Sequence, residues 1–332
     1  MEQNEQHHHD MKMYGEIKLY AGSGSPDLAQ KIAEYLKQEL SPREVIQFPN
    51  ENIFIKLNSS TRGQDVYVIQ TTSSPVHYNL MELLIMIQTI RLDSAARITA
   101  VIPYLCYGRS DKKDQPRVPI TARLVADMIE SAGADRYMTF DPHAGQIQGF
   151  FSIPGDVLTA SHTITKYIST NLLSQMNDPV VVATDLGFAK KGRNYALDLD
   201  VPIAFIEKRR IGNNAKTEAL TLIGEVHDRD VIIVDDEVDT GGSIAQAVQV
   251  AKNNGARDIY LAFIHPIFSR NAAERLAELP VKQIITTDTV AIPAEKMKQL
   301  EGKLTILSVA PMLGEVIRRA HEGRSVGEMF NE

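Results

Sequence analysis

The segment that decides the fold is Val231-Ile232-Ile233-Val234-Asp235-Asp236-Glu237-Val238-Asp239-Thr240-Gly241-Gly242-Ser243-Ile244. Its first four residues are apolar and β-branched, which predicts a buried strand. Adjacent carboxylates follow, and a Thr-Gly-Gly-Ser turn then opens a predicted helix. Such a turn presents backbone N–H groups and hydroxyls at the positive end of a helix, and its glycines let an anion approach closely. The segment therefore predicts a phosphate-binding site at the carboxyl end of a strand.

The acidic residues beside this turn indicate what carries the phosphate. Side chains alternate between the two faces of a strand, so Asp235 and Asp236 are expected to point in different directions. Carboxylates next to a phosphate site suit sugar hydroxyls, held directly or through Mg²⁺. The segment thus predicts recognition of a ribose 5-phosphate. The alternative is a strand-to-helix turn whose polar residues only cap the helix.

The same alternation of strand and helix recurs through most of the chain. Apolar runs predict strands at Ile17–Ala21, Val66–Gln70, Ile98–Pro103, Val180–Thr184, Val231–Val234 and Ile259–Ile264. Helical patterns cover Asp27–Leu40, Leu80–Arg91, Ile120–Ser131, Ser243–Asn253, Ala272–Leu279 and Pro311–His321. Continuous apolar strands that alternate with helices indicate an α/β protein with mainly parallel sheets flanked by helices. Ligands of such proteins bind at the carboxyl ends of the strands.

Composition restricts the class of protein. The 332 residues predict about two domains, and a composition of 43% hydrophobic and 23% charged residues excludes a disordered chain. The formal net charge of −7 argues against nucleic acid as a partner. No apolar run approaches the roughly 20 residues of a membrane span, so we expect no membrane partner. The single cysteine, Cys106, and a polar N-terminus without a secretory signal lead us to expect a cytoplasmic protein.

A division between domains is expected where Ile153-Pro154-Gly155-Asp156 interrupts the pattern. We expect a flexible tail over residues 1–14, an N-terminal domain over 15–157, and a C-terminal domain over 158–308 that carries the phosphate-binding segment. Residues 309–332 are expected to form a helix and tail that pack back on the N-terminal domain.

Further segments resemble one enzyme family. They are Asn79–Ile87, Val101–Tyr104, Asp111–Asp114 and Asp141–Phe151, in this order along the chain. Together with the phosphate-binding segment they resemble ribose-phosphate diphosphokinase, or phosphoribosyl pyrophosphate (PRPP) synthetase. The resemblance implies two tandem phosphoribosyltransferase-type domains, each a mainly parallel sheet flanked by helices. It also implies Mg²⁺-dependent transfer of the diphosphoryl group of ATP to the anomeric hydroxyl of ribose 5-phosphate, which gives PRPP and AMP.

The resemblance assigns roles to individual residues. The ribose and its 5-phosphate would be held by Asp235, Asp236, Asp239, Thr240, Gly241, Gly242 and Ser243. Catalysis would rest on Lys208, Arg210 and His143, the first two closing over the transferring phosphoryl groups. His143 and Asp185 match residues associated with Mg²⁺. The nucleotide-binding positions are Phe48, Asn50, Asn52, Arg109, Ser110, Lys112, Lys113 and Arg117.

The family also suggests an assembly. Its members form homodimers that assemble further, commonly to hexamers, and the aromatic residue matched by Phe48 reaches a nucleotide across a subunit contact. We therefore expect a homodimer that assembles to a hexamer, with ATP and a ribose 5-phosphate-containing acceptor as the small-molecule partners.

Four residues depart from the family at ligand positions. Asn52 stands where glutamate is common, Ser110 where glutamine is usual, Phe188 where a glycine is expected, and Lys191 where arginine is frequent. A phenylalanine in place of a glycine adds bulk near the ligand, and loss of the glutamate would alter nucleotide preference. The four departures together leave a larger acceptor such as ADP-ribose open as an alternative. A non-catalytic regulatory subunit of a PRPP synthetase complex is an alternative of another class. A phosphoribosyltransferase would lack the segment Asp141–Phe151 and the doubled length.

Overall fold

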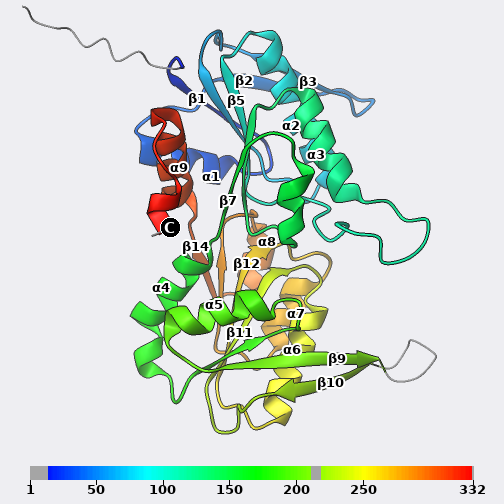
Figure 1. Ribbon diagram of the computed structural model, residues 1–332, viewed down its shortest axis with the longest axis vertical. Coiled ribbons are helices and arrows are strands. Elements are labelled where there is room, and N and C mark those ends of the chain that lie inside the picture. The colour runs from blue at the N-terminus through cyan, green and yellow to red at the C-terminus, as the bar shows by residue number, and fades with distance from the viewer. Residues whose placement is uncertain (1–13, 211–217, 331–332) are drawn as a thin grey trace, which may run out of the picture.

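The computed structural model describes residues 14–210 and 218–330, and within them the strands form two sheets and a hairpin (Figure 1). The first sheet is parallel throughout, in the spatial order β1 (Ile17–Ala21), β4 (Asp65–Ile69), β5 (Arg97–Ile102), β6 (Arg136–Phe140), β7 (Gly155–Leu158). The second has the order β10 (Glu218–Ile223), β9 (Ile203–Arg210), β8 (Val180–Ala183), β11 (Val231–Val238), β12 (Ile259–Pro266), β13 (Gln283–Thr287), β14 (Leu304–Leu307). Only β10 runs antiparallel to its neighbour in these two sheets as described. The hairpin pairs β2 (Arg43–Gln47) with β3 (Ile53–Leu57).

Helices cover both faces of both sheets. They are α1 (Pro26–Leu36), α2 (Val76–Leu92), α3 (Thr121–Ala132), α4 (Ser161–Asn171), α5 (Ala189–Leu199), α6 (Gly242–Asn253), α7 (Ala272–Glu278), α8 (Ala294–Gln299) and α9 (Ala310–Glu322). Short 3₁₀ turns lie at Gly145–Phe150, Leu173–Gln175 and Gly327–Phe330. No helix in the described ranges combines the length and the apolar character needed to cross a membrane. This layered arrangement confirms the predicted α/β class.

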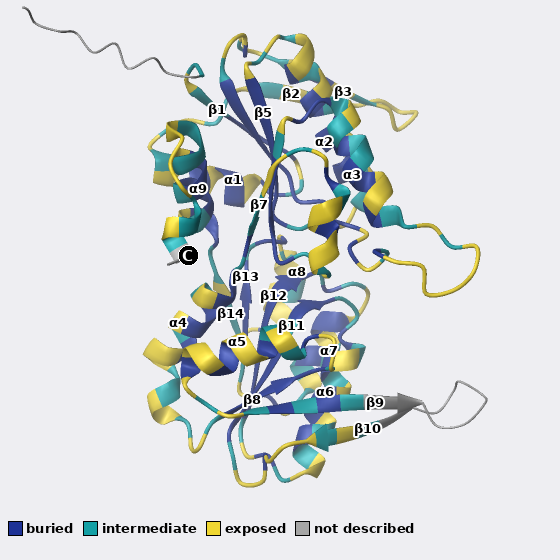
Figure 2. Cartoon of the chain, viewed as in Figure 1, coloured by how far each residue is buried: buried dark blue, intermediate teal, exposed yellow. Residues whose placement is uncertain are grey.

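Buried apolar side chains show how the layers pack. On the first sheet, α1 and α9 cover one face and α2 and α3 the other. On the second sheet, α4 and α5 cover one face and α6 and α7 the other. Figure 2 shows most strands of the two sheets buried and the exposed residues on the outer helices and the loops. We refer to the first sheet with α1–α3 as the N-terminal domain, and to the second sheet with α4–α8 as the C-terminal domain.

The last helix, α9, leaves the second sheet and packs beside α1 on the first (Figure 1). The buried carboxylate of Asp65 accepts hydrogen bonds from Arg97 Nε at 2.7 Å and Nη2 at 2.6 Å. His321 Nδ1 lies 2.8 Å from the same carboxylate, and Arg97 Nη2 also donates to the carbonyl oxygen of Ala320 at 3.0 Å. Because removing one partner would leave a buried charge uncompensated, this cluster ties the end of α9 to the N-terminal domain.

Some predicted boundaries are wrong, for local reasons. The first helix ends at Leu36 rather than Leu40, because Lys37 adopts a left-handed conformation with φ of 55°. The strand predicted over Val231–Val234 continues to Val238. Residues 1–13 of the predicted tail lie outside the described residues, but Tyr14 stacks on Arg97, with the guanidinium 4.1 Å from the ring centroid. The predicted domain division after residue 157 stays a prediction; β7 spans Gly155–Leu158 at this point of the chain.

Candidate active site

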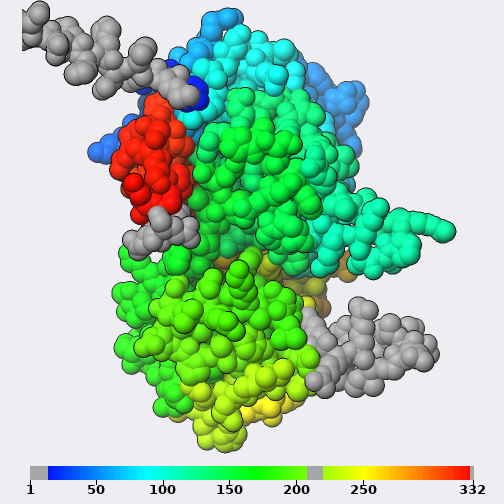
Figure 3. All heavy atoms as spheres, in the orientation of Figure 1, coloured from blue at the N-terminus to red at the C-terminus, as the bar shows by residue number. Residues whose placement is uncertain are grey.

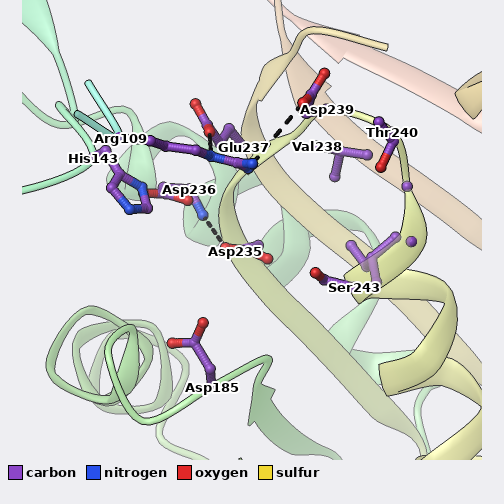
Figure 4. Close-up of a pocket in the computed structure, with 13 residues that line it drawn as sticks. Arg109, His143, Asp185, Asp235, Asp236, Glu237, Val238, Asp239, Thr240 and Ser243 are labelled. Atoms are coloured by element: carbon purple, nitrogen blue, oxygen red, sulfur yellow. Dashed lines mark hydrogen bonds and ion pairs between the residues drawn. The ribbon is translucent and has the colours of Figure 1, made fainter. Parts of the chain in front are cut away.

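A cavity of about 300 Å³ lies at the carboxyl end of β11, where the two domains meet (Figure 4). It is lined by Arg109, His143, Asp185 and the run Asp235–Ile244. Arg109 and His143 come from loops of the N-terminal domain, and the other residues come from the C-terminal domain. The structure therefore brings together residues that lie more than 90 positions apart, as in the pair His143 and Asp236 with a separation of 93.

The acidic residues Asp235–Glu237 belong to β11 itself rather than to the turn after it. β11 pairs with β12 as far as the partners Val238 and Pro266, so ladder hydrogen bonds fix the backbone that carries the carboxylates. The side chains then reach different neighbours, as strand alternation predicts. The Thr184 hydroxyl donates to Asp235 Oδ2 at 2.8 Å. The backbone N–H of Asp236 donates to Asp235 Oδ1 at 2.9 Å.

The pKa values of Asp235 and Asp236 are shifted in opposite directions. Burial, reinforced by the neighbouring charge of Asp236, raises the pKa of Asp235 well above its ordinary value. Burial also opposes ionisation of Asp236, but the hydrogen bond and charge of His143 outweigh it and lower the pKa of Asp236 to about 2. His143 Nδ1 lies 2.9 Å from Asp236 Oδ2, and this hydrogen bond raises the pKa of the imidazole. His143 and Asp236 therefore form a charge-assisted hydrogen bond between the two domains.

Arg109 makes a second contact between the domains. Its Nε forms an ion pair with Glu237 Oε1, and its Nη1 lies 3.9 Å from Asp239 Oδ2. Burial raises the pKa of Glu237, although the charge of Arg109 acts in the opposite direction. The Glu237 side chain is only 6% exposed, whereas that of Arg109 is 57% exposed. The guanidinium thus has room for a further anionic partner on its solvent side.

The turn Thr240–Ser243 leads from the strand into α6. Gly241 has a φ of 74°, a conformation that glycine adopts without strain, and it precedes the first residue of α6, Gly242. Backbone N–H groups in the first turn of a helix have no partner within the helix and favour an anion. The turn lines the cavity beside the carboxylates (Figure 4). An anionic group and neighbouring hydroxyls could therefore be held in one place.

Comparison with known proteins places this site in a family. Residues 17–133 match the family model of the N-terminal domain of ribose phosphate pyrophosphokinase, and residues 209–331 match that of the phosphoribosyl synthetase-associated domain. The ribose-phosphate pyrophosphokinase of Caldanaerobacter subterraneus subsp. tengcongensis is 44% identical over 95% of this chain and 98% of the relative. The chain belongs to the ribose-phosphate pyrophosphokinase family.

Further relatives agree with this placement. The ribose-phosphate pyrophosphokinase of Aquifex aeolicus is 41% identical over 95% of this chain and 99% of its own length. The crystal structure of phosphoribosylpyrophosphate synthetase from Mycobacterium smegmatis matches with a TM-score of 0.88 and 39% identity, covering 93% of this chain and 100% of that one. The predicted family and the two tandem α/β domains are thereby confirmed.

The donor groups in the cavity fit the Mg²⁺ that the family implies. Asp185 follows β8 and lines the cavity with His143 (Figure 4). The described residues contain no group of three or more His, Cys, Asp or Glu side chains arranged to hold a metal ion. Mg²⁺ usually keeps several waters and takes one or two carboxylates together with substrate phosphates, so a complete protein cage is not needed. Asp185, a single carboxylate in the same cavity as the turn Thr240–Ser243, fits this mode of Mg²⁺ binding.

Most predicted nucleotide-binding residues lie outside this cavity. Lys112, Lys113 and Arg117 are exposed on the segment 111–120, which projects from the side of the molecule (Figure 3). The Ser110 hydroxyl lies 3.2 Å from the hydroxyl of Thr121 at the start of α3. Of the predicted nucleotide-binding residues, the structure places Arg109 alone among the described residues that line the cavity.

The hairpin residues predicted to contact the nucleotide lie away from the cavity in the same chain. Phe48 and Asn52 flank the turn between β2 and β3, where the backbone N–H of Phe48 donates to the carbonyl oxygen of Asn52 at 2.8 Å. Asn50 lies in the turn and accepts a hydrogen bond from the N–H of Asn52 at 3.3 Å. For the predicted catalytic residues Lys208 and Arg210, only the backbone at the end of β9 is described, and their side chains lie outside the description.

Phe188 and Lys191 are two of the four departures from the family, and the structure shows the surroundings of both. Phe188 is 6% exposed and packs at the start of α5 against Tyr195, with ring centroids 6.5 Å apart. It lines a separate cavity and not the one beside β11, and its N–H donates to Asp185 Oδ1 at 2.9 Å. Lys191 Nζ donates to the carbonyl oxygen of Pro142, next to His143, at 3.2 Å. The Phe188 side chain is therefore buried in the C-terminal domain and does not line the cavity beside β11.

Three residues in or around the cavity were missed by sequence reasoning. Thr184 supports Asp235, Glu237 holds Arg109, and Arg275 Nη1 donates to the carbonyl oxygen of Thr240 at 2.9 Å. Glu237 could have been found, since it lies within the deciding segment between two predicted ligands. Arg275 lies on α7 and no local pattern marks it.

Proposed function

We propose that this chain transfers the diphosphoryl group of ATP to the anomeric hydroxyl of ribose 5-phosphate, which gives PRPP and AMP. One observation carries the proposal: the turn Thr240–Ser243 and the carboxylates of β11 share a cavity with Arg109 and His143 of the other domain. Relatives that are 41% to 44% identical over 95% of the chain carry the name ribose-phosphate pyrophosphokinase, which supports it.

The acceptor is proposed to occupy the β11 side of the cavity. Thr240, Gly241, Gly242 and Ser243 would hold the 5-phosphate through backbone N–H groups and hydroxyls at the start of α6. Asp235, Asp236 and Asp239 would hold the ribose hydroxyls. Asp235 and Asp236 are braced by hydrogen bonds to the Thr184 hydroxyl and His143 respectively, so little reorganisation would be needed on binding.

The nucleotide is proposed to approach from the side of Arg109, with the exposed Lys112, Lys113 and Arg117 adding positive charge for the triphosphate. Asp185 and His143 would hold Mg²⁺, directly or through its waters. When bound, the ion supplies positive charge to the phosphate oxygens.

In the transfer itself, a bond forms between the anomeric oxygen and the β-phosphorus of ATP. The bond between that phosphorus and the oxygen bridging to the α-phosphate breaks, the oxygen leaves with AMP, and the hydroxyl proton is released. Such a reaction depends on positioning and charge stabilisation more than on a protein nucleophile. Lys208 and Arg210, at the end of β9, are proposed to neutralise the charge that develops on the transferred group.

The site is proposed to be completed by a second copy of the chain in a homodimer that assembles to a hexamer. Phe48 and Phe54 are both 46% exposed, with ring centroids 6.3 Å apart, on a hairpin that does not line the cavity of its own chain. On a neighbouring copy, Phe48, Asn50 and Asn52 would contact the adenine. Sedimentation velocity of wild type and of Phe48→Ala, together with KM for ATP, tests this assembly.

The reaction is tested by AMP release from Mg²⁺ and ATP, with ribose 5-phosphate and ADP-ribose offered as competing acceptors and the products identified by mass. Preference for ribose 5-phosphate with PRPP as product supports the proposal. Preference for ADP-ribose would replace the acceptor, and reaction with neither would favour a regulatory subunit. Phe188, one of the four departures that raised the ADP-ribose alternative, does not line the cavity beside β11.

A further inference from the structure

Arg275, on α7, packs against the turn that follows β11. Its Nη1 donates to the carbonyl oxygen of Thr240 at 2.9 Å. A Cβ built on Gly242 would lie 3.4 Å from this Nη1, and one built on Gly241 would lie 3.7 Å from Arg275 Cδ. The Arg275 side chain therefore packs against the backbone of both glycines, although Arg275 itself does not line the cavity.

Arg275 also places a positive charge beside a turn that has none of its own. The turn Thr240–Ser243 contains no lysine or arginine, and the carboxylates of β11 and of Asp239 stand beside it. A phosphate monoester carries roughly 1.5 to 2 negative charges near neutral pH, so it would bind next to groups of its own sign. Arg109 pairs with Glu237, and its free side is proposed to face the nucleotide rather than the 5-phosphate. Among the described residues, none forms an ion pair with Arg275 within 4.0 Å.

We propose that Arg275 is a positioning residue for the 5-phosphate of the acceptor. It holds the backbone of Thr240 and Gly241 in the conformation that α6 begins from, and it places a positive charge behind the turn to offset the neighbouring carboxylates. Because it touches the turn and not the cavity, it acts on acceptor affinity rather than on the transferred group. The inference rests on the proposed function, since it assumes that this turn binds phosphate.

The test compares Arg275→Met and Arg275→Lys with wild type and with Arg270→Met, which makes the same change at an exposed position just before α7. Affinity for ribose 5-phosphate is measured by titration calorimetry without ATP, and KM and kcat are measured in the AMP assay. Arg275→Met is expected to weaken ribose 5-phosphate binding about tenfold, or about 1.4 kcal/mol at 25 °C. The KM for ribose 5-phosphate is expected to rise by the same factor of about ten. KM for ATP and kcat are expected to change less than about twofold. Arg275→Lys should restore most of the affinity, and Arg270→Met should match wild type.

A further variant separates charge from hydrogen bonding and guards against a folding defect. Arg275→Gln keeps a donor for the Thr240 carbonyl but no charge, so it should also bind ribose 5-phosphate more weakly than Arg275→Lys. Wild-type affinity in Arg275→Met or Arg275→Gln would overturn the inference and leave the proposed function standing. An equal loss in KM for ATP, KM for ribose 5-phosphate and kcat would also overturn it, because Arg275 would then only support the fold. Failure of the wild type to release AMP with ribose 5-phosphate as acceptor would overturn the proposed function itself.

Discussion

Replacing Phe188 with alanine tests whether this residue serves the core or the acceptor. The side chain is 6% exposed and packs against Tyr195, and it lines a cavity separate from the one beside β11. Its contact with Asp185 uses the backbone N–H, which alanine retains. The substitution is therefore expected to lower stability and to leave the choice of acceptor unchanged.

The expected loss of stability follows from the burial of the Phe188 side chain. Truncating a buried phenylalanine to alanine lowers the free energy of unfolding by about 3–5 kcal/mol. Phe188 borders a cavity of about 510 Å³ and so lacks neighbours on one side, which places the loss at the lower end, about 3 kcal/mol. With an unfolding entropy of about 2.1 cal/mol/K per residue, the melting temperature falls by about 4 °C if the whole chain unfolds together. It falls by about 10 °C if only the roughly 150 residues of the C-terminal domain unfold.

The assay pairs a thermal melt with the competition between ribose 5-phosphate and ADP-ribose. Leu186→Ala is the matched control, because Leu186 lies on the same loop but is 52% exposed, and its melting temperature should stay within about 1 °C of wild type. A fall of less than about 2 °C for Phe188→Ala would refute the core role. A shift of the product ratio toward either acceptor at unchanged stability would show that Phe188 acts on the acceptor after all.

Three further outcomes are expected. Lys208→Ala should lower kcat far more than it weakens ribose 5-phosphate binding, and equal turnover in variant and wild type would remove Lys208 from catalysis. Asp235→Ala should weaken acceptor binding measured by calorimetry, and unchanged affinity would remove Asp235 from the site. Burial lowers the pKa of His265 to about 4, below the ordinary 6.5, so the unfolded chain binds more protons between these values and stability falls as pH drops through this window. His265→Gln, which can replace the contacts with Thr289 and Phe140, should lose part of that acid sensitivity in denaturant melts at pH 7 and pH 4.5.

Strands were predictable where the apolar run and the hydrogen-bonded length coincide. β1 matches its prediction at both ends, and β8 ends one residue early. β11 was predicted too short because its apolar run stops at Val234, whereas pairing with β12 carries the strand four residues further into acidic sequence. Tertiary pairing, which no local pattern records, decides that end. The end of α1 was missed for a related reason, since Lys37 takes the left-handed position where glycine is the usual signal.

The candidate site, too, could be predicted from the sequence only in part. The turn Thr240–Ser243 could be recognised from sequence, because its spacing alone presents N–H groups at a helix start. The contacts of the β11 carboxylates with His143 and Arg109 could not, because they join loops of different domains. The family resemblance named both residues as ligands but said nothing of these pairings. Phe188 shows the converse limit, because the sequence marks it as a departure from the family but does not show that the side chain is buried against Tyr195.

The ion pair between Arg109 and Glu237 bears on how a nucleotide can bind at the site. Glu237 is buried on β11, so it cannot follow a mobile partner, whereas more than half of the Arg109 side chain is exposed on its loop, at 57%. A nucleotide phosphate that binds Arg109 must share the guanidinium with this carboxylate or displace it. If displaced, Glu237 would be left buried and charged unless it took up a proton or another cation, which its raised pKa favours. Sharing needs no such change, because a guanidinium has five N–H donors and the free side of Arg109 faces solvent. The geometry therefore favours a nucleotide that adds to the existing ion pair, with the contact between the two domains kept intact while substrate binds.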